Sequence, residues 1–358
     1  MLVAHDSLRK LIAEIIRRGG SEAGEAELVA AHLVDANLAG HDSHGVQLVP
    51  AYVRHLQDGL VVPNSPVKVA KDDGAFLMFD GQRGYGRRVA GEAMAMAIER
   101  CRQVGVVVLT LANAHHIGRV GAYGEMASAA GLVSMHFVNV TDHGGLVAPH
   151  RGRDSRFSTN PVCIAIPGTD AHPPLLLDMA TSGIAMGKVA VARNAGKRVP
   201  EGNLVNAAGQ PTTDPGVMYE EPRGSLLPFG AHKGYGLAVF AEILAGGLSG
   251  GGTIQPGNPR RGGVVNNMFA VIVDPARLAG MEWLRREIDG FVDYVKASPP
   301  VDPAAPVLVP GDPERYSRES RRRDGIPLDA TTWDGVLTAA ETLGLARRAA
   351  EAIAGLTG

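Results

Sequence analysis

Several of the twelve histidines stand where the chain makes a polar turn or leaves an apolar run. A histidine titrates near neutrality, so it can give or take the proton that accompanies chemistry at a hydroxyl or carbonyl carbon. Turns and strand ends are the places where α/β proteins gather reacting groups. We therefore take these histidines as candidate acid–base residues, with an ordinary structural histidine as the alternative for each. They are His41, His44, His115, His116 and His232.

Two further side chains can join His44. Ser43 precedes it in the turn Gly40–Gly45, and Asp178 ends the apolar run Leu175–Leu177, where a strand delivers a carboxylate to the next helix. Ser43, His44 and Asp178 would form a hydrogen-bonded relay that orients the imidazole, although a helix cap explains Asp178 equally well. The same residue types suggest a hydrolase. However, adjacent Ser and His seldom face each other as nucleophile and base, and no Gly-x-Ser-x-Gly motif is present.

Neither standard phosphate-binding motif occurs. The sequence contains no Gly-x-Gly-x-x-Gly after a strand and no Gly-x-x-x-x-Gly-Lys-Ser/Thr, which excludes those folds but not a nucleotide ligand. The turn Gly118–Gly121, which opens a helix after a strand, is one place where backbone N–H groups can hold a phosphate. The histidine pairs lack the carboxylate-rich patterns of metal sites, so we expect no essential metal.

Composition places the chain among globular proteins. Its 358 residues, 45% hydrophobic and 20% charged, are enough to bury a sizeable core, and a net charge of −2 argues against nucleic acid as a partner. Cys101 and Cys163 show no metal or disulfide spacing. No signal peptide and no run of 18 apolar residues is found, so we expect no membrane span and a cytoplasmic location. The basic group Arg318–Arg323 is interpreted as a solvated helix face, with a phosphate or partner site as the alternative.

The periodicity of apolar residues predicts the elements that must position these side chains. Helical spacing dominates the first sixty residues, and helices return after Met281. Between them, short apolar runs alternate with alanine-rich stretches, which is typical of an α/β fold. Two such runs lie within 157–178 with only a short turn between them, so the sheet must be mixed. The expected strands are 75–79, 104–112, 132–140, 162–167, 174–178 and 264–273, and the expected helices between them are 181–195 and 233–245.

A set of motifs, in order along the chain, resembles the type-2 malate/L-lactate dehydrogenase family. The motifs are Gly40-His41-Asp42-Ser43-His44-Gly45-Val46, Asn113-Ala114-His115-His116-Ile117-Gly118, Thr159-Asn160-Pro161, Leu177-Asp178-Met179-Ala180-Thr181-Ser182, Gly187-Lys188, Pro211-Thr212-Thr213-Asp214-Pro215 and Gly230-Ala231-His232-Lys233-Gly234-Tyr235-Gly236. The resemblance runs from about residue 5 to residue 345. It implies NAD- or NADP-dependent oxidoreductases of 2-hydroxy and 2-oxo acids, ureidoglycolate or cyclic imino acids.

The resemblance also implies a fold and an assembly. It predicts a non-Rossmann α/β fold in which a mixed-sheet NAD(P)-binding part, residues 74–280, packs beside a mainly helical substrate and dimerisation part, residues 1–73 and 281–358. The protein is expected to be a homodimer. By the same resemblance the cofactor contacts are His44, Gly118, Arg119, Val120, Leu176, Leu177, Asp178, Met179, Ala180, His232, Asn267, Gly311, Asp312, Pro313 and Glu314.

The mechanism that the resemblance implies makes His44 the acid in reduction and the base in oxidation, with Ser43 and Asp178 as its relay. In some relatives the equivalent of His116 is given that role, and the sequence does not choose between the two. Substrate contacts are expected from Leu48, His116 and Lys233. Many members carry an arginine where Leu48 stands, suited to gripping a carboxylate. Leucine there favours a 2-oxo acid larger than pyruvate.

NAD is the expected cofactor, with NADP as the alternative. Asp312 and Glu314, near the expected adenosine end, would repel a 2′-phosphate, whereas Arg315 would attract one.

Three other functions remain open at this point. A cyclic-imine reductase needs the same hydride and the same acid as a 2-oxo acid reductase. A Ser-His-Asp hydrolase would use Ser43 as nucleophile and would ignore nicotinamide nucleotides. A non-catalytic protein would bind the nucleotide without turnover.

Overall fold

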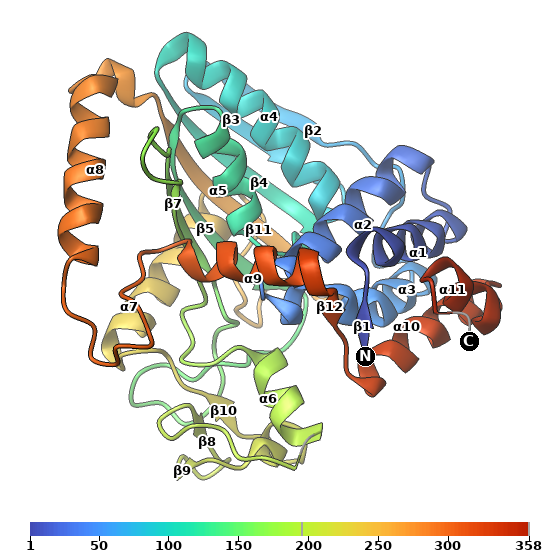
Figure 1. Cartoon of the computed structure of the whole chain (residues 1–358). Helices are drawn as coiled ribbons and strands as arrows, with labels where there is room; N and C mark the ends of the chain where they lie inside the picture. The colour runs from blue at the N-terminus through green and yellow to red at the C-terminus, as the bar shows by residue number, and fades with distance from the viewer. Residues whose placement is uncertain (195, 357–358) are drawn as a thin grey trace.

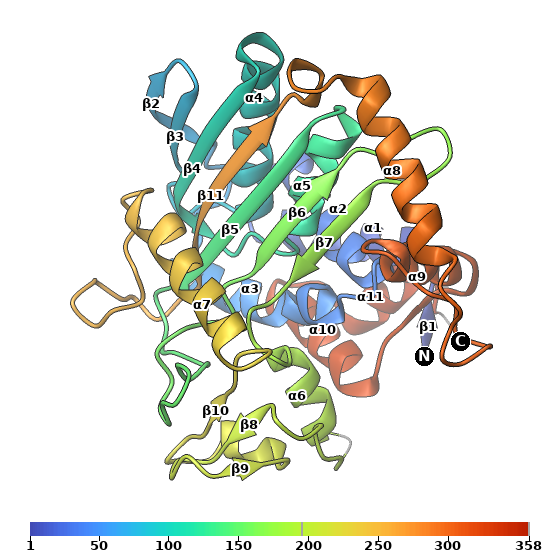
Figure 2. The same cartoon turned by 90° about the vertical axis from the view of Figure 1, so that its left-hand side faces the viewer.

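A seven-stranded mixed sheet forms the centre of the molecule (Figure 2). The computed structural model describes residues 1–194 and 196–356. Within those residues the strand order is β2-β3-β4-β11-β5-β6-β7, and every neighbouring pair is antiparallel except β3 and β4. The strands are β2 (Lys68–Asp73), β3 (Phe76–Asp80), β4 (Val106–His115), β5 (Val133–Thr141), β6 (Val162–Ile166), β7 (Leu175–Met179) and β11 (Val265–Val273).

This sheet confirms the α/β fold and the six strands expected from the sequence. The two apolar runs within 157–178 are β6 and β7, which pair antiparallel as predicted. Strand β2 was not predicted, because all six of its residues are exposed and four of them are charged. It is an edge strand, and a strand solvated on both faces shows no hydrophobic alternation for sequence analysis to find.

Helices cover both faces of the sheet. Helices α4 (Gly86–Val104) and α5 (Gly121–Ala129) pack on one face over a core to which Val107, Leu109 and Leu111 of β4 contribute, all three fully buried. On the other face lie α7 (His232–Ala241) and the π-helical turn Glu242–Gly247 (Figure 2). The alternation of β4 thus places its apolar residues under α4 and α5.

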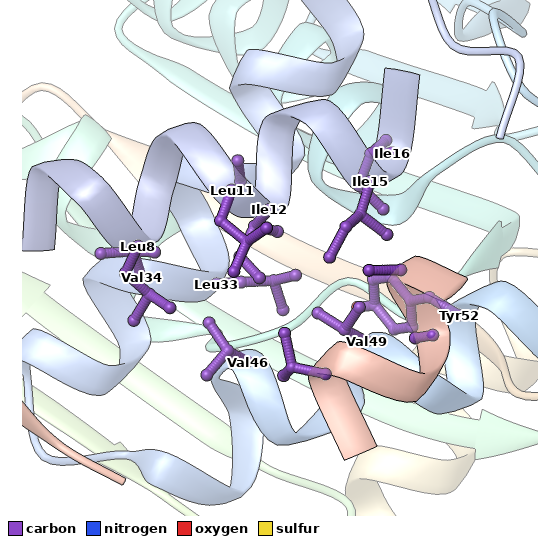
Figure 3. Packing of buried hydrophobic residues seen from close by; sticks show 14 of the residues in the cluster. Leu8, Leu11, Ile12, Ile15, Ile16, Leu33, Val34, Val46, Val49 and Tyr52 are labelled. Atoms are coloured by element: carbon purple, nitrogen blue, oxygen red, sulfur yellow. The ribbon is translucent and has the colours of Figure 1, made fainter. Parts of the chain in front are cut away.

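The N-terminal and C-terminal segments together form a helical lobe beside the sheet (Figure 1). Figure 3 shows its core, where the periodic residues of the first helix lie against the second helix and the turn that follows. Leu8, Leu11, Ile12, Ile15 and Ile16 are at most 1% exposed, as their helical spacing predicted. The helices of the lobe are α1 (His5–Arg18), α2 (Ala23–Leu38), α3 (Val49–Gln57), α10 (Ala330–Thr342) and α11 (Arg347–Ile353), and β1 (Leu2–Val3) pairs with β12 (Ile326–Pro327).

A third, smaller group of elements contains strands that were not predicted. Strands β8 (Leu204–Val205), β9 (Pro211–Thr212) and β10 (Ser225–Leu226) form a three-stranded sheet next to α6 (Met186–Asn194) and the 3₁₀ turn Pro215–Met218, around a core of its own. Helix α6 begins five residues later than the expected helix at Thr181. The backbone N–H groups of Thr181 and Gly183 donate to Thr159 and Leu227, which holds this stretch in irregular conformation.

Two C-terminal helices, α8 (Met281–Lys296) and α9 (Asp312–Asp324), connect the central sheet to the helical lobe. Helix α8 packs against the β6–β7 edge of the sheet through Ile288 and Val292, and α9 runs from that edge toward the helical lobe (Figure 1). The packing therefore differs from the expected division at residues 73 and 281, because β2 belongs to the sheet and α8 covers it. In the described part of the chain, no helix has the length and apolar character needed to cross a membrane.

The contribution of the helical lobe to stability can be tested on one helix. Leu33 of α2 is 1% exposed, whereas Leu28 of the same helix is 46% exposed. We expect Leu33→Ala to lower the free energy of unfolding by about 2–5 kcal/mol, because it leaves a cavity in the core, and Leu28→Ala to change it by less than about 0.5 kcal/mol. Urea denaturation followed by circular dichroism measures both. Equal effects of the two variants would contradict this packing.

Candidate active site

The polar turn Gly40–Gly45 is held rigidly from two sides. It forms the 3₁₀ turn Asp42–His44, followed by a second 3₁₀ turn, Val46–Leu48, that leads into α3. Asn37 of α2 donates to Asp42 at 2.6 Å and accepts from the backbone N–H of Val46 at 2.8 Å. Arg321 of α9 forms two hydrogen bonds with the Asp42 carboxylate, at 2.6 and 3.0 Å. These contacts fix the turn that carries Ser43 and His44.

Two adjoining cavities meet at this turn. The larger, of about 700 Å³, lies between the turn, the end of β7, α6 and the start of α9, and the smaller, of about 250 Å³, lies toward α3 and the ends of β4 and β5. They share Ser43, His44, Val120, Thr159, Pro161, Ala180, Ala185 and Gly187. The predicted acid–base residue His44 therefore stands where the two cavities join.

His44 and His116 lie side by side at this junction. Their rings are nearly parallel, at 17°, with centroids 5.8 Å apart, and both line the smaller cavity. Ser43 Oγ lies 3.0 Å from Nδ1 of His44, as the relay predicted, and the Tyr52 hydroxyl lies 2.8 Å from Nδ1 of His116. In each ring a hydroxyl thus occupies Nδ1, which leaves Nε2 as the nitrogen available to a ligand.

The surroundings of both imidazoles favour the neutral form. Burial, followed by the electrostatic effects of His41 and Arg119, lowers the pKa of His44 to about 4. Burial, followed by His44, His55 and His143, lowers the pKa of His116 to about 3. A neutral imidazole is the form that accepts a proton from an alcohol, and a nearby anionic ligand would raise these pKa values toward neutrality.

Asp178 lies in the larger cavity, but its hydrogen bond goes elsewhere than predicted. Its Oδ2 accepts from the backbone N–H of Gly121, at the start of α5, at 2.7 Å and lies 4.0 Å from Nη1 of Arg119. Within the described residues no hydrogen bond joins Asp178 to Ser43 or His44, so the relay consists of Ser43 and His44 in this structure. Burial, only partly offset by His41 and Arg119, raises the pKa of the Asp178 carboxyl. The carboxylate thus caps α5, which precedes it in the chain, and not the following helix, as the helix-cap interpretation expected.

Arg119 is a buried cation in the wall of the larger cavity. Its side chain is 1% exposed, and it shares the carboxylates of Asp35 and Glu125 with Arg318 of α9. The Nε and Nη1 groups of Arg119 have no hydrogen-bond partner among the described residues. A buried guanidinium with two unused donors, in a residue that lines a cavity, fits a phosphate or carboxylate ligand.

The basic group 318–323 is only partly a solvated face. Arg318 and Arg321 are turned inward to Asp35 and Asp42, and their side chains are 17% and 18% exposed. Arg323 pairs with the neighbouring Asp324 at the surface. The sequence interpretation therefore failed for two of these arginines, because their acidic partners lie at least 193 residues away in the chain.

Other predicted cofactor contacts fall into two groups. Gly118, Arg119, Val120, Met179, Ala180, Pro313 and Glu314 line one cavity or the other. Leu176, Leu177, His232, Asn267, Gly311 and Asp312 line neither, and nor does the predicted substrate residue Lys233. His232 and Lys233 are exposed at the start of α7. Asn267 is fully buried, where its amide binds Asn113, Asn139 and Gly252.

Two residues that sequence analysis did not single out shape the site. Tyr52 contacts His116, and His32 accepts the backbone N–H of Arg119 at 3.0 Å. Lys188 of the motif Gly187-Lys188 lines the larger cavity. Tyr52 and His32 occupy buried helical positions, where the sequence gives them the same appearance as core residues. Gly187 is needed for close approach, since a Cβ there would lie 2.4 Å from the Cβ of Ser43.

Comparison with known proteins agrees with this geometry. The family model for malate/L-lactate dehydrogenase matches residues 3–337. Hydroxycarboxylate dehydrogenase B of Escherichia coli K12 is 46% identical over 341 residues, 95% of this chain and 93% of that protein. L-Lactate dehydrogenase of Cupriavidus necator is 42% identical over 346 residues, 97% and 99% of the two chains. A solved E. coli structure of the malate/lactate dehydrogenase type is 44% identical, with a TM-score of 0.95 over 99% of both chains.

The chain belongs to the malate/L-lactate dehydrogenase family. It is a 2-hydroxy acid oxidoreductase that works with a nicotinamide cofactor. This confirms the resemblance drawn from the ordered motifs. The residues of the larger cavity fit such a cofactor, because Arg119, which has two unused donors, and Val120 line it immediately before the N-terminus of α5.

The low pKa values of the two histidines predict a pH dependence of stability. A buried histidine that stays neutral binds fewer protons than the unfolded chain below pH 6.5, so its contribution is complete above that pH and is lost as the pH falls toward 4. We expect the free energy of unfolding to decrease from pH 7.5 to 5.5, by up to about 1.4 kcal/mol per pH unit for each such histidine. Urea titrations should show a smaller decrease in His44→Asn. An unchanged dependence in that variant would contradict a neutral His44.

Proposed function

We propose that this oxidoreductase acts on 2-hydroxy and 2-oxo acids whose side chain is apolar and larger than that of lactate. The observation that carries the proposal is the smaller cavity, which opens directly beside His44 and His116. Most of its wall is apolar, and among the described residues neither Lys nor Arg lines it. The apolar lining residues are Leu48, Ala51, Ile117, Val120, Val138, Val140, Leu146, Met186 and Val264.

The charged groups of the site lie on the other side of the two imidazoles. Arg119 and Lys188 line the larger cavity, which suits the phosphates of a dinucleotide and the carboxylate of an acid. A substrate whose C2 oxygen lies at the imidazoles can place its side chain in the smaller cavity. An apolar wall disfavours a second carboxylate there, because burying an unpaired charge is costly.

The proposed mechanism assigns the proton to His44. In oxidation, Nε2 of neutral His44 takes the hydroxyl proton of the substrate, and in reduction the imidazolium returns it to the carbonyl oxygen. Ser43 keeps the ring oriented through Nδ1. A bound nicotinamide supplies or accepts the hydride at C2. The anionic substrate stabilises the imidazolium, so the pKa of His44 rises when it binds.

We propose NAD as the cofactor, in preference to NADP. Arg315, the residue that would attract a 2′-phosphate, forms an ion pair with Asp312 and donates to the backbone oxygen of Pro174 at 3.0 Å. Glu314 lines the cavity and lies 3.1 Å from His41. A carboxylate at this position suits ribose hydroxyls better than a phosphate.

We also propose a homodimer, as the family resemblance implies. Large apolar side chains are exposed along α7 and the π-helical turn that follows it. Phe240, Ile243 and Leu248 are each more than half exposed, and a second copy of the chain would cover them.

The experiment that tests the proposal follows absorbance at the nicotinamide band. NADH and NADPH are each mixed with pyruvate, oxaloacetate, 2-oxoglutarate, phenylpyruvate and a cyclic imine. We expect NADH to be preferred and phenylpyruvate to give the highest kcat/KM. Preference for oxaloacetate would contradict the role of the smaller cavity, and preference for the imine would make the chain a cyclic-imine reductase.

Leu48 offers a test of specificity. We expect Leu48→Arg to place a cation in the apolar cavity, so that kcat/KM falls for phenylpyruvate and rises for oxaloacetate, shifting their ratio by about tenfold or more. Leu48→Met, which keeps the wall apolar, is the matched control and should leave the ratio nearly unchanged. The same ratio in both variants would show that Leu48 does not contact the substrate side chain.

A further inference from the structure

Tyr52 stands behind the imidazole of His116 in a buried position. It belongs to α3, is 5% exposed, and packs edge-on against His115 with ring centroids 5.0 Å apart. Its hydroxyl lies 2.8 Å from Nδ1 of His116 and 3.5 Å from the backbone oxygen of the same residue. The mechanism proposed above assigns no role to Tyr52, although Tyr52 is hydrogen-bonded to His116, one of the two histidines of the site.

The direction of this hydrogen bond follows from the chemistry of the phenol. Burial, followed by the neighbouring Tyr123 and Tyr85, raises the pKa of Tyr52, so its hydroxyl keeps its hydrogen. Of the two acceptors within reach, Nδ1 of His116 is much the closer. A hydroxyl hydrogen directed at Nδ1 forms much the shorter of its two possible hydrogen bonds, which favours this arrangement, and a neutral ring whose Nδ1 accepts carries its hydrogen on Nε2.

His44 is held differently. Its Nδ1 lies 3.0 Å from Oγ of Ser43, and a serine hydroxyl can either donate or accept by rotating about its C–O bond. His44 can therefore have Nε2 unprotonated, or carry hydrogens on both nitrogens, without losing this contact. The two neighbouring rings, alike in residue type, thus differ in the partner that sets their protonation.

We propose that Tyr52 is a positioning residue that fixes the tautomer of His116, so that His116 donates a hydrogen bond to the substrate oxygen and His44 alone transfers the proton. This assignment rests on the proposed function. A substrate hydroxyl fits the pair, because its O–H donates to Nε2 of His44 while its lone pair accepts from Nε2–H of His116. In oxidation, the O–H proton passes to His44, and the C2 hydrogen leaves with its electron pair to the nicotinamide.

The same geometry keeps His116 from acting as the base. Its Nε2 already carries a hydrogen, and protonation at Nδ1 requires the Tyr52 hydrogen to turn to the backbone oxygen, 3.5 Å from the hydroxyl oxygen, so that this oxygen accepts from Nδ1–H across the 2.8 Å contact. Burial and the nearby His44, His55 and His143 also oppose a positive charge on this ring. The N–H of His116 therefore remains available to the oxygen that becomes the carbonyl, where it stabilises developing charge.

Nitrogen NMR of the histidine side chains tests the tautomer without turnover. Uniformly ¹⁵N-labelled protein is compared with Tyr52→Phe, which keeps the ring and removes the hydroxyl, and the His116 signals are assigned by their loss in His116→Gln. We expect the Nε2–H tautomer in the wild type and a mixture of tautomers in Tyr52→Phe. The Nδ1–H tautomer in the wild type, or identical spectra in a folded Tyr52→Phe variant, would overturn the proposal.

Kinetics of two glutamine variants test the division of roles independently of Tyr52. Glutamine keeps an N–H donor but has no basic nitrogen, so His116→Gln should retain kcat within about tenfold, whereas His44→Gln should lose about a hundredfold or more. His116→Leu, which has no donor, should fall well below His116→Gln. The reverse order of the two glutamine variants would overturn the assignment. If the wild type turned over no 2-oxo acid, the proposed function would fail while the NMR result still decided the tautomer.

Discussion

The buried charge of Arg119 is the constraint on which the rest of the structure depends. Its guanidinium lies at the start of α5, and its partners come from α2, α5 and, through the shared carboxylates, α9. Removing either Asp35 or Glu125 would leave two cations to share one carboxylate, one of them the buried Arg119, which is destabilising. One ion network therefore ties the helical lobe, the central sheet and the C-terminal helix to the wall of the larger cavity.

The polar turn Gly40–Gly45 also depends on three parts of the molecule, the helical lobe, α9 and α6. Asn37 and Arg321 hold Asp42 from α2 and α9, and Gly187 of α6 packs directly against Ser43. The turn is thus clamped by segments that are far apart in the sequence. This arrangement keeps the two imidazoles parallel while only their Nε2 atoms are left for a ligand.

The spacing of apolar residues was enough to predict the large elements. In α1 and in central strands such as β4, buried apolar residues recur at the period of the helix or the strand. The small sheet and β2 were missed, since two-residue strands and a fully exposed strand carry no such period. In the site, the histidines of the turn could be predicted from their residue type. Tyr52 could not, because its hydrogen-bond partner His116 is 64 positions away in the chain. Asn267 illustrates a finer limit. The pairing of β11 with β4 shifts register between Asn266 and Met268, and Asn266, not Asn267, lines the cavity.

The pairing of β1 with β12 constrains the order in which the parts of the chain can fold. The helical lobe is built from the first sixty residues and from α10 and α11, so its core cannot close until almost the entire chain has left the ribosome. The sheet can collapse earlier around α4 and α5. During synthesis α1 and α2 can pack against each other, but the apolar residues of the lobe that contact α10 and α11 stay uncovered until those helices are made. The active-site turn, clamped by α9, is among the last parts of the enzyme to form.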